Sequence, residues 1–166
     1  MNSQLLIGIG ILGFALLLDI IGTAIPYWWV INLGDGRSSS IGLFQVCGHA
    51  EGQTVCLAVT AETDWLKAVQ ALMILSILAL GAAVGLALLF CFLMKDNDQL
   101  GILSGVHGAV GSIFAVIGVI TFAAKIMDAD PPPLGGLHAG IFLAFVSAVF
   151  AIVGSVMMVT SRNANN

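Results

Sequence analysis

The chain has 166 residues, of which 59% are hydrophobic and 8% are charged, and its formal net charge is −4 at pH 7. A water-soluble domain needs far more charge to cover its surface, so this composition excludes an ordinary soluble protein. Lipid must surround most of the chain, and we expect membrane lipids, and no nucleic acid, among its partners.

Four apolar runs are long enough to cross a bilayer, which takes about 20 residues of helix. The first is expected to be retained, because the preceding MNSQ has no Lys or Arg and the run exceeds the roughly 7 to 15 apolar residues of a signal peptide. The runs predict transmembrane helices at residues 5–25, 66–94, 102–125 and 137–160. Residues 1–166 are then one membrane domain, with connecting segments at 26–65, 95–101 and 126–136 and a tail at 161–166.

Asp19 is the acidic residue of the first predicted span, about 9 Å below Pro26 at 1.5 Å per residue. A carboxylate at this depth requires a partner or a proton. Lys67 and Gln70, near the corresponding end of the second span, are the candidate partners. Two interpretations remain open: a polar contact between the first two helices, and an ion or proton site. We favour the contact, because no second carboxylate lies within the spans to continue a relay.

The segment between the first two spans holds two of the three cysteines, Cys47 and Cys56, around the polar stretch GHAEGQTV. The flanking sequences SSSIGLFQV and QTVCLAVT are rich in Val, Ile, Thr and Phe, which predicts a β-hairpin. Cysteines that face each other on a hairpin reach disulfide geometry without backbone strain. A disulfide persists on the oxidising side of a membrane, so we expect an extracellular loop and cytoplasmic chain termini.

Two other interpretations of the cysteine pair are less favoured. In a cytosolic loop both thiols would stay reduced. A metal site would need more ligands than His49, the one soft ligand nearby. The few lysines and arginines do not decide the orientation, because some of them lie at helix ends.

A spaced set of residues runs through the first loop, namely Trp28, Gly42, Leu43, Phe44, Cys47 and Cys56. This set resembles the signature of the claudins, peripheral myelin protein, the epithelial membrane proteins and lens fibre membrane protein. The segments DWLKAVQALMILSIL at 64–78 and GIFLAF at 140–145 are similar to the myelin and epithelial members, so the chain resembles a divergent member nearer that branch. The resemblance implies an all-α integral membrane fold, a left-handed bundle of four transmembrane helices with a small extracellular antiparallel β-sheet from the first loop.

The sequence departs from this family in two places that bear on function. Phe44 stands where relatives carry a second tryptophan, which keeps an aromatic wedge but loses the indole donor. The tail SRNANN lacks the hydrophobic carboxy-terminal residue that claudins present to PDZ scaffolds, so we expect no PDZ-binding tail.

The later spans carry small-xxx-small patterns, which let helices in lipid approach closely. They are GAAVG at 81–85, GILSG at 101–105 and GLHAG at 136–140. We expect these patterns to form contacts within the chain rather than between chains. DPPPLGG at 130–136 should add at most a short edge strand. Cys91, near the inner end of the second span, is a candidate for S-palmitoylation or, equally, a buried thiol.

The sequence contains no Cys-x-x-Cys, metal-ligand cluster, glycine-rich phosphate loop or catalytic triad. We therefore expect no enzyme activity, no catalytic residue and neither metal nor cofactor. The resemblance implies a plasma-membrane protein of cell–cell contacts that organises the membrane or mediates adhesion. The alternatives are a claudin-like paracellular barrier or cation-selective pore, and an auxiliary subunit of a channel or receptor.

The expected partners are a second copy of the chain, in cis or in trans, or another membrane protein. Ile41 and Val46 are the candidate contact residues, since they are apolar and are expected at the tip of the first loop. Acidic residues in the loops would favour cations if the chain forms a pore. A transporter that acts through Asp19 is the least favoured interpretation, because the spans hold no network of charges.

Overall fold

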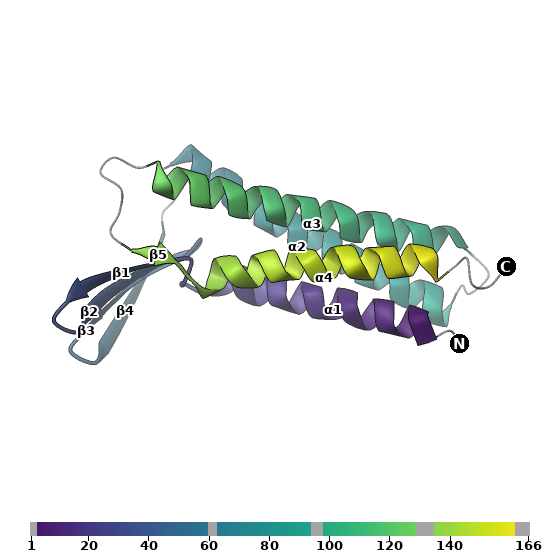
Figure 1. The fold of residues 1–166 in the computed structure, drawn as a ribbon, viewed down its shortest axis with the longest axis horizontal. Helices are drawn as coiled ribbons and strands as arrows, with labels where there is room; N and C mark the ends of the chain where they lie inside the picture. The colour runs from purple at the N-terminus through teal and green to yellow at the C-terminus, as the bar shows by residue number, and fades with distance from the viewer. Residues whose placement is uncertain (1–2, 60–62, 94–97, 129–134, 162–166) are drawn as a thin grey trace.

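The computed structural model describes residues 3–59, 63–93, 98–128 and 135–161. Within these ranges, four helices form an elongated bundle: α1 (Ser3–Ala24), α2 (Asp64–Phe92), α3 (Asp98–Met127) and α4 (Ala139–Thr160). A five-stranded sheet stands at one end of the bundle, while α1 begins and α4 ends at the far end (Figure 1). Residues 130–134 and 162–166 lie outside the described ranges, so the expectations for DPPPL and for the tail stay predictions.

Each of these helices is long and apolar enough to cross a membrane. α1 and α4 have 22 residues each. This gives them a length of about 33 Å, close to the thickness of the hydrocarbon layer. α2 and α3, with 29 and 30 residues, extend beyond that layer. Both helices begin earlier than predicted, α2 at Asp64 rather than at 66 and α3 at Asp98 rather than at 102.

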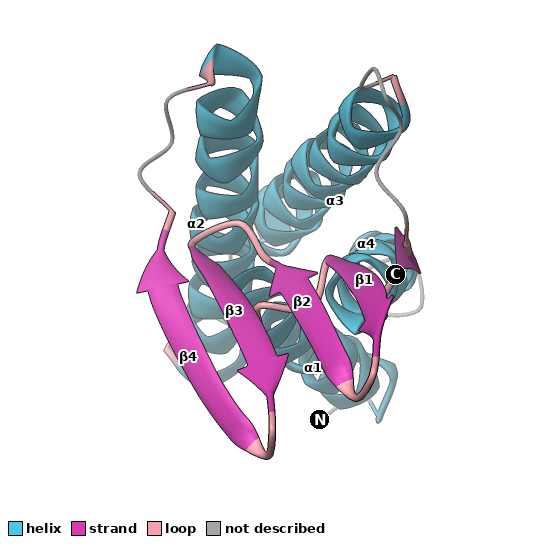
Figure 2. Cartoon of the chain, turned by 90° about the vertical axis from the view of Figure 1, so that its left-hand side faces the viewer, coloured by secondary structure: helices cyan, strands magenta, loops and turns pink. Residues whose placement is uncertain are grey.

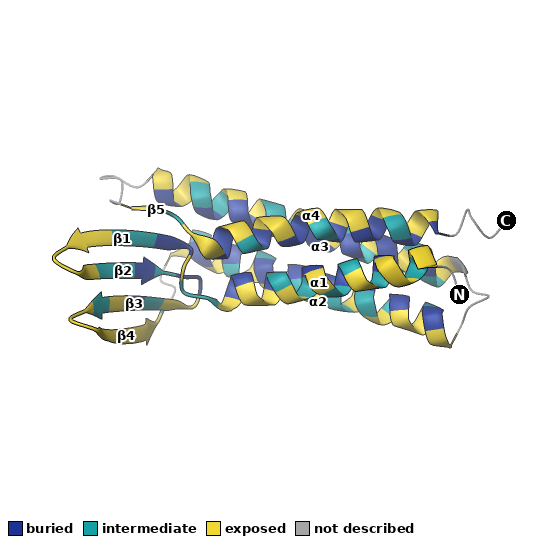
Figure 3. Cartoon of the chain, turned by 60° about the horizontal axis from the view of Figure 1, so that its bottom comes forward, coloured by how far each residue is buried: buried dark blue, intermediate teal, exposed yellow. Residues whose placement is uncertain are grey.

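The helices bury their inward faces and turn large apolar side chains outward, as a bundle in lipid requires (Figure 3). α1 packs along α4 and α2 packs along α3, while α3 and α4 join the two pairs. The contact between α1 and α2 is less extensive. The core consists of one cluster near the sheet around Trp28 and Phe122, and two smaller clusters further along around Leu80 and Leu12.

Glycines allow close approach at some of these helix contacts but not at all of them. A Cβ added at Gly22 of α1 would lie 3.0 Å from the backbone nitrogen of Ala144 on α4. One added at Gly105 of α3 would lie equally close to α4, so the predicted GILSG pattern does form a contact within the chain. Gly81 and Gly85 have no atom of the described residues within 4 Å of an added Cβ. The contact of the GAAVG segment within the chain is therefore not made by its two glycines but by Ala83 between them, which is fully buried and whose carbonyl oxygen accepts from Ser104 of α3.

The sheet has the strand order β4-β3-β2-β1-β5, and each pair of neighbours is antiparallel (Figure 2). The two hairpins turn at residues 35–36 and 51–52, where the backbone has positive φ. The predicted hairpin is confirmed, and so is a short edge strand after the proline-rich segment. The bounds are β1 Trp29–Gly34, β2 Arg37–Ile41, β3 Gln45–Ala50, β4 Gln53–Ala58 and β5 Gly136–Leu137.

Replacing Gly22 by alanine should destabilise the bundle by about 1 to 3 kcal/mol, because the new methyl group would meet the backbone of α4. Gly10 lies on the same helix and has open space around it, so Gly10→Ala is the matched control. It should leave stability unchanged or raise it slightly, since alanine favours the helix. Thermal unfolding in detergent, followed by tryptophan fluorescence, measures both variants. Equal midpoints would contradict the packing of α1 on α4.

Candidate functional site: the sheet and its seat on the bundle

Trp28 fixes the sheet to the bundle. Its side chain is fully buried, and the indole Nε1–H donates to the carbonyl oxygen of Gly22 near the end of α1 at 2.7 Å. The ring meets Phe122 of α3 edge-on, with centroids 5.0 Å apart. It also covers Gly140 at the start of α4, where any Cβ would collide with it. One side chain thus contacts three helices immediately before β1 begins.

The segment Gly42-Leu43-Phe44 turns the chain from β2 into β3 against the bundle. A Cβ at Gly42 would lie 2.6 Å from Cα of Pro26, so this crossing requires glycine. Leu43 is fully buried, and its carbonyl oxygen accepts a hydrogen bond of 2.7 Å from Nε2 of Gln70 on α2. Phe44 is 37% exposed, so its ring is only partly covered, and its role as an aromatic wedge stays a prediction.

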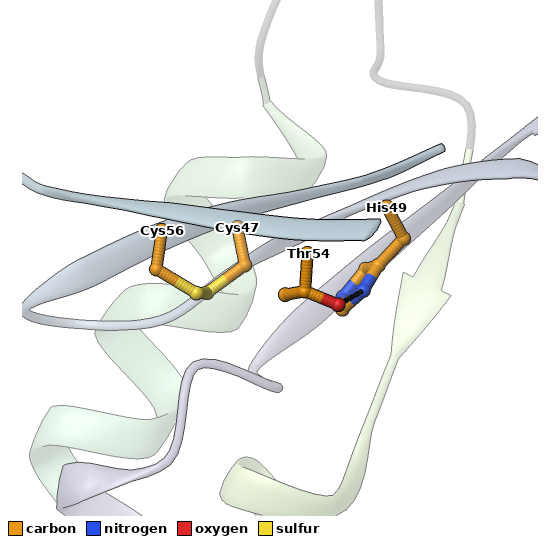
Figure 4. The surroundings of a disulfide bond; sticks show 4 residues. All are labelled: Cys47, His49, Thr54 and Cys56. Carbon is orange, nitrogen blue, oxygen red and sulfur yellow. Dashed lines mark hydrogen bonds between the residues drawn. A yellow bond between two sulfur atoms is a disulfide. The ribbon is translucent and has the colours of Figure 1, made fainter. Parts of the chain in front are cut away.

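A disulfide joins Cys47 of β3 to Cys56 of β4, as predicted, across a Cα–Cα distance of 4.1 Å (Figure 4). Further along the same two strands, Nδ1 of His49 and Oγ1 of Thr54 share a hydrogen bond of 2.8 Å. Cys47 is 1% exposed, whereas Cys56 lies on the exposed edge strand. The covalent link is expected to stabilise the hairpin by about 2 to 4 kcal/mol.

Tyr27 connects this hairpin to the start of α4. Its ring is stacked on that of His49, with centroids 6.2 Å apart and planes inclined by 11°, and it faces the ring of His138 at 6.1 Å. His138 is the residue that precedes α4. The sequence gives no signal for this group, because its three rings come from three separate segments.

Ile41 and Val46 do not lie at the tip of the loop, which corrects their assignment as candidate contacts. They face each other across β2 and β3 at the end of the sheet next to the bundle, and both are half-buried. Ile41 also packs against the core cluster around Trp28. The prediction failed because these apolar residues flank the turn that rests on the bundle, whereas the free tips are the glycine-containing turns at 35–36 and 51–52.

Large exposed apolar side chains of the sheet lie elsewhere, at Leu33 of β1 and at two positions of β4. Val55 is 63% exposed and Leu57 is 70% exposed, both on the edge strand β4. Their register opposite Gly48 and Val46 places the two side chains on one face of the sheet. The alternation in QTVCLA could have indicated them, since the covalent link through Cys56 requires its neighbours to point the other way.

Asp19 contacts neither of its predicted partners. The hydroxyl of Ser76 on α2 donates to its Oδ2 at 2.6 Å, and both side chains are fully buried. Gln70 binds the sheet, and Lys67 is exposed and lies 4.0 Å from Asp64. The first turns of α2 extend beyond the end of α1, on the side of the sheet. The residue of α2 that lies at the depth of Asp19 therefore comes later in the helix than Lys67 and Gln70. The favoured contact between the first two helices is present, with a different partner.

Cys91 is buried in α2 near the end away from the sheet. Burial fits the packed thiol and leaves no accessible sulfur for acylation in this conformation. Among the described residues, no group of three or more His, Cys, Asp or Glu is placed to hold a metal ion.

The chain was compared with known proteins by family and individually. The model of the PMP-22/EMP/MP20/Claudin family matches residues 1–158, which include the whole sheet and nearly all of the bundle. No curated protein matches the chain individually.

Replacing Gln70 by leucine should destabilise the protein by about 1 to 2 kcal/mol, because the carbonyl oxygen of Leu43 would lose its donor. Lys67→Met is the matched control, since this side chain lies on the exposed side of the same helix and should be dispensable. The measurement is the midpoint of thermal unfolding together with the rate at which a protease cuts the sheet. A Gln70→Leu variant as resistant as Lys67→Met would rule out a role for this bond in holding the sheet.

Single cysteine replacements should differ in how fast the remaining thiol reacts with a maleimide. Cys47→Ser leaves Cys56 on an exposed strand, where labelling should be rapid, whereas Cys56→Ser leaves Cys47 shielded and should label much more slowly. The double replacement gives the background from buried Cys91. Labelling is read from the mass of the folded protein. Equal rates in the two single variants would mean that the hairpin opens when the disulfide is lost.

Proposed function

Because the chain belongs to the PMP-22/EMP/MP20/Claudin family of four-span membrane proteins, we propose that it is a non-enzymatic protein of cell–cell contacts. In this role it organises the membrane or adheres to a neighbouring cell through its sheet. The observation that carries the proposal is the position of the sheet, which projects beyond the helices as a disulfide-linked unit (Figure 1).

The edge strand β4 supports the sheet as the contact surface. All six of its residues are exposed, and in the part of the chain that the structure describes no strand pairs with its outer side. Exposed edges commonly carry Lys or Pro, which discourage pairing with other chains, and β4 has neither. Val55 and Leu57 add apolar surface to the same strand.

The disulfide supports an extracellular position for the sheet. A link between Cys47 and Cys56 persists in an oxidising compartment, which the sheet reaches if it faces the lumen during synthesis and the exterior afterwards. The start of α1 and the end of α4 then face the cytoplasm. Together these features support a plasma-membrane protein whose sheet meets other molecules outside the cell.

A second candidate function is a paracellular barrier or cation-selective pore. Asp35 and Glu51 stand exposed at the tips of the two hairpins, where an assembly of several copies would bring carboxylates together. Carboxylates that line a narrow path concentrate cations. If Asp35→Asn and Glu51→Gln together leave the ratio of sodium to chloride permeability of an expressing cell monolayer unchanged, this candidate is excluded.

Adhesion is tested in cells without junctions of their own. Two populations that express the protein with different fluorescent tags are mixed, and fluorescence at contacts between them is compared with the free membrane. We expect enrichment only where both neighbours express the protein. Leu57→Asp should reduce the enrichment several-fold, because it places a charge on the exposed apolar face of β4.

The matched control is Ala58→Asp, which adds the same charge to the next residue of the strand, on the opposite face. It should leave the enrichment near the original level, provided that surface delivery, measured by biotinylation, is equal. A uniform distribution of the unmodified protein would refute adhesion between like molecules and point to organisation within one membrane.

A further inference from the structure

The buried carboxyl group of Asp19 has an oxygen atom that the bundle does not use. Oδ2 accepts the bond from Ser76, but Oδ1 has no hydrogen-bond partner among the described residues. Thr23 lies one turn further along α1 and is 4% exposed, and its Oγ1 likewise has no partner there. Leaving such a group unsatisfied costs about 1 to 3 kcal/mol. Two polar atoms on one face of the same helix thus point to a missing ligand.

No positive side chain of the described residues is placed to neutralise Asp19. α1 has no other charged residue and α4 has none, while the charged residues of α2, Asp64 and Lys67, lie in its first turn. On α3, Lys125 lies in the last turn, and Nδ1 of His107 is bonded to a carbonyl of its own helix. A carboxylate without a counter-charge in a lipid-embedded bundle costs several kcal/mol, so a positive ligand is favoured over water alone.

Hydroxyl-bearing side chains surround this position and interrupt the apolar core. Ser147 of α4 donates to the carbonyl oxygen of Ala15, one turn from Asp19. We define the polar layer as Asp19, Thr23, Ser76 and Ser147. Along α1, α2 and α4 these residues stand between the core cluster around Trp28 and the cluster that contains Ala15, Leu80 and Ala151.

We propose that the polar layer binds one alkali-metal ion, sodium or potassium. Oδ1 of Asp19 and Oγ1 of Thr23 are its ligands, and the hydroxyl oxygen of Ser76 completes the contact from α2. Oxygen ligands suit hard cations, and a single carboxylate matches a single positive charge. The ion would join α1 to α2, the helix pair whose direct contact is less extensive.

The test uses the full-length protein in detergent and follows its thermal unfolding by tryptophan fluorescence. One series replaces sodium or potassium by N-methylglucamine at constant ionic strength and pH, and a second lowers the pH from neutral to mildly acidic at constant salt. At neutral pH the midpoint should rise with sodium or potassium, and this dependence should weaken in acid, because a protonated Asp19 no longer attracts the ion. A midpoint that rises in acid but does not respond to sodium or potassium would mean that Asp19 takes up a proton instead, and would overturn the proposal, as would insensitivity in both series.

Asp19→Asn, which keeps the shape and removes the charge, should abolish the dependence on sodium or potassium. Asp64→Asn is the matched control, because that carboxylate is exposed and should leave the dependence intact. If Asp19→Asn retains the full dependence, Asp19 is not the ligand and the proposal fails.

A second pair of variants keeps the charge and covers the case in which Asp19→Asn does not fold. Thr23→Val has the same shape but lacks the ligand oxygen, so the cation concentration at half-maximal stabilisation should rise about tenfold. Ser104→Ala removes another buried hydroxyl, which is bonded to a carbonyl of α2 away from the polar layer. It should lower the midpoint without shifting that concentration. Equal concentrations for both variants would exclude Thr23 as a ligand and overturn the proposed site.

Discussion

The last four carbonyl groups of a helix have no donor within the helix, and in a bundle that excludes water they need one from elsewhere. In α1 the indole of Trp28 supplies a donor to Gly22. The backbone of the same tryptophan donates to Ile41 at 3.0 Å and accepts from His138 at 3.0 Å. Side chain and main chain together therefore fix the end of α1, the start of the sheet and the entry into α4. This residue therefore fixes the place where β1 leaves the bundle.

Polar side chains within the helices also need hydrogen-bond partners, because lipid offers none. Some hydroxyls, such as those of Thr121 and Ser155, donate to carbonyls of their own helix one turn back. These bonds do not connect one helix to another. Ser104 and Ser147 instead donate to carbonyls of neighbouring helices. Asp19 and Thr23 are exceptions, because among the described residues only one oxygen of the Asp19 carboxyl group is bonded and the Thr23 hydroxyl has no partner. Polar groups thus determine which helices are tied together, while apolar packing supplies most of the buried area.

The features that were predicted correctly are those that a short stretch of sequence indicates by itself. The spans follow from the length of the apolar runs, and the hairpin follows from alternation around Cys47 and Cys56. What could not be predicted depends on how distant segments are placed against one another. Asp19 meets Ser76 because α2 starts further out than α1 ends, and no local pattern reports that offset. A small-xxx-small pattern likewise shows that one face of a helix carries small residues, but not whether that face turns inward, and in GAAVG the two glycines do not.

The attachment of the sheet to the helices has a mechanical consequence. Trp28 ties it to α1, the bond from Gln70 ties it to α2, and β5 leads directly into α4. A force that pulls on the sheet would therefore be shared among three helix ends rather than act on the nearest one alone. Under such a load the bundle would resist as a unit, and no single helix would be drawn out of the membrane first.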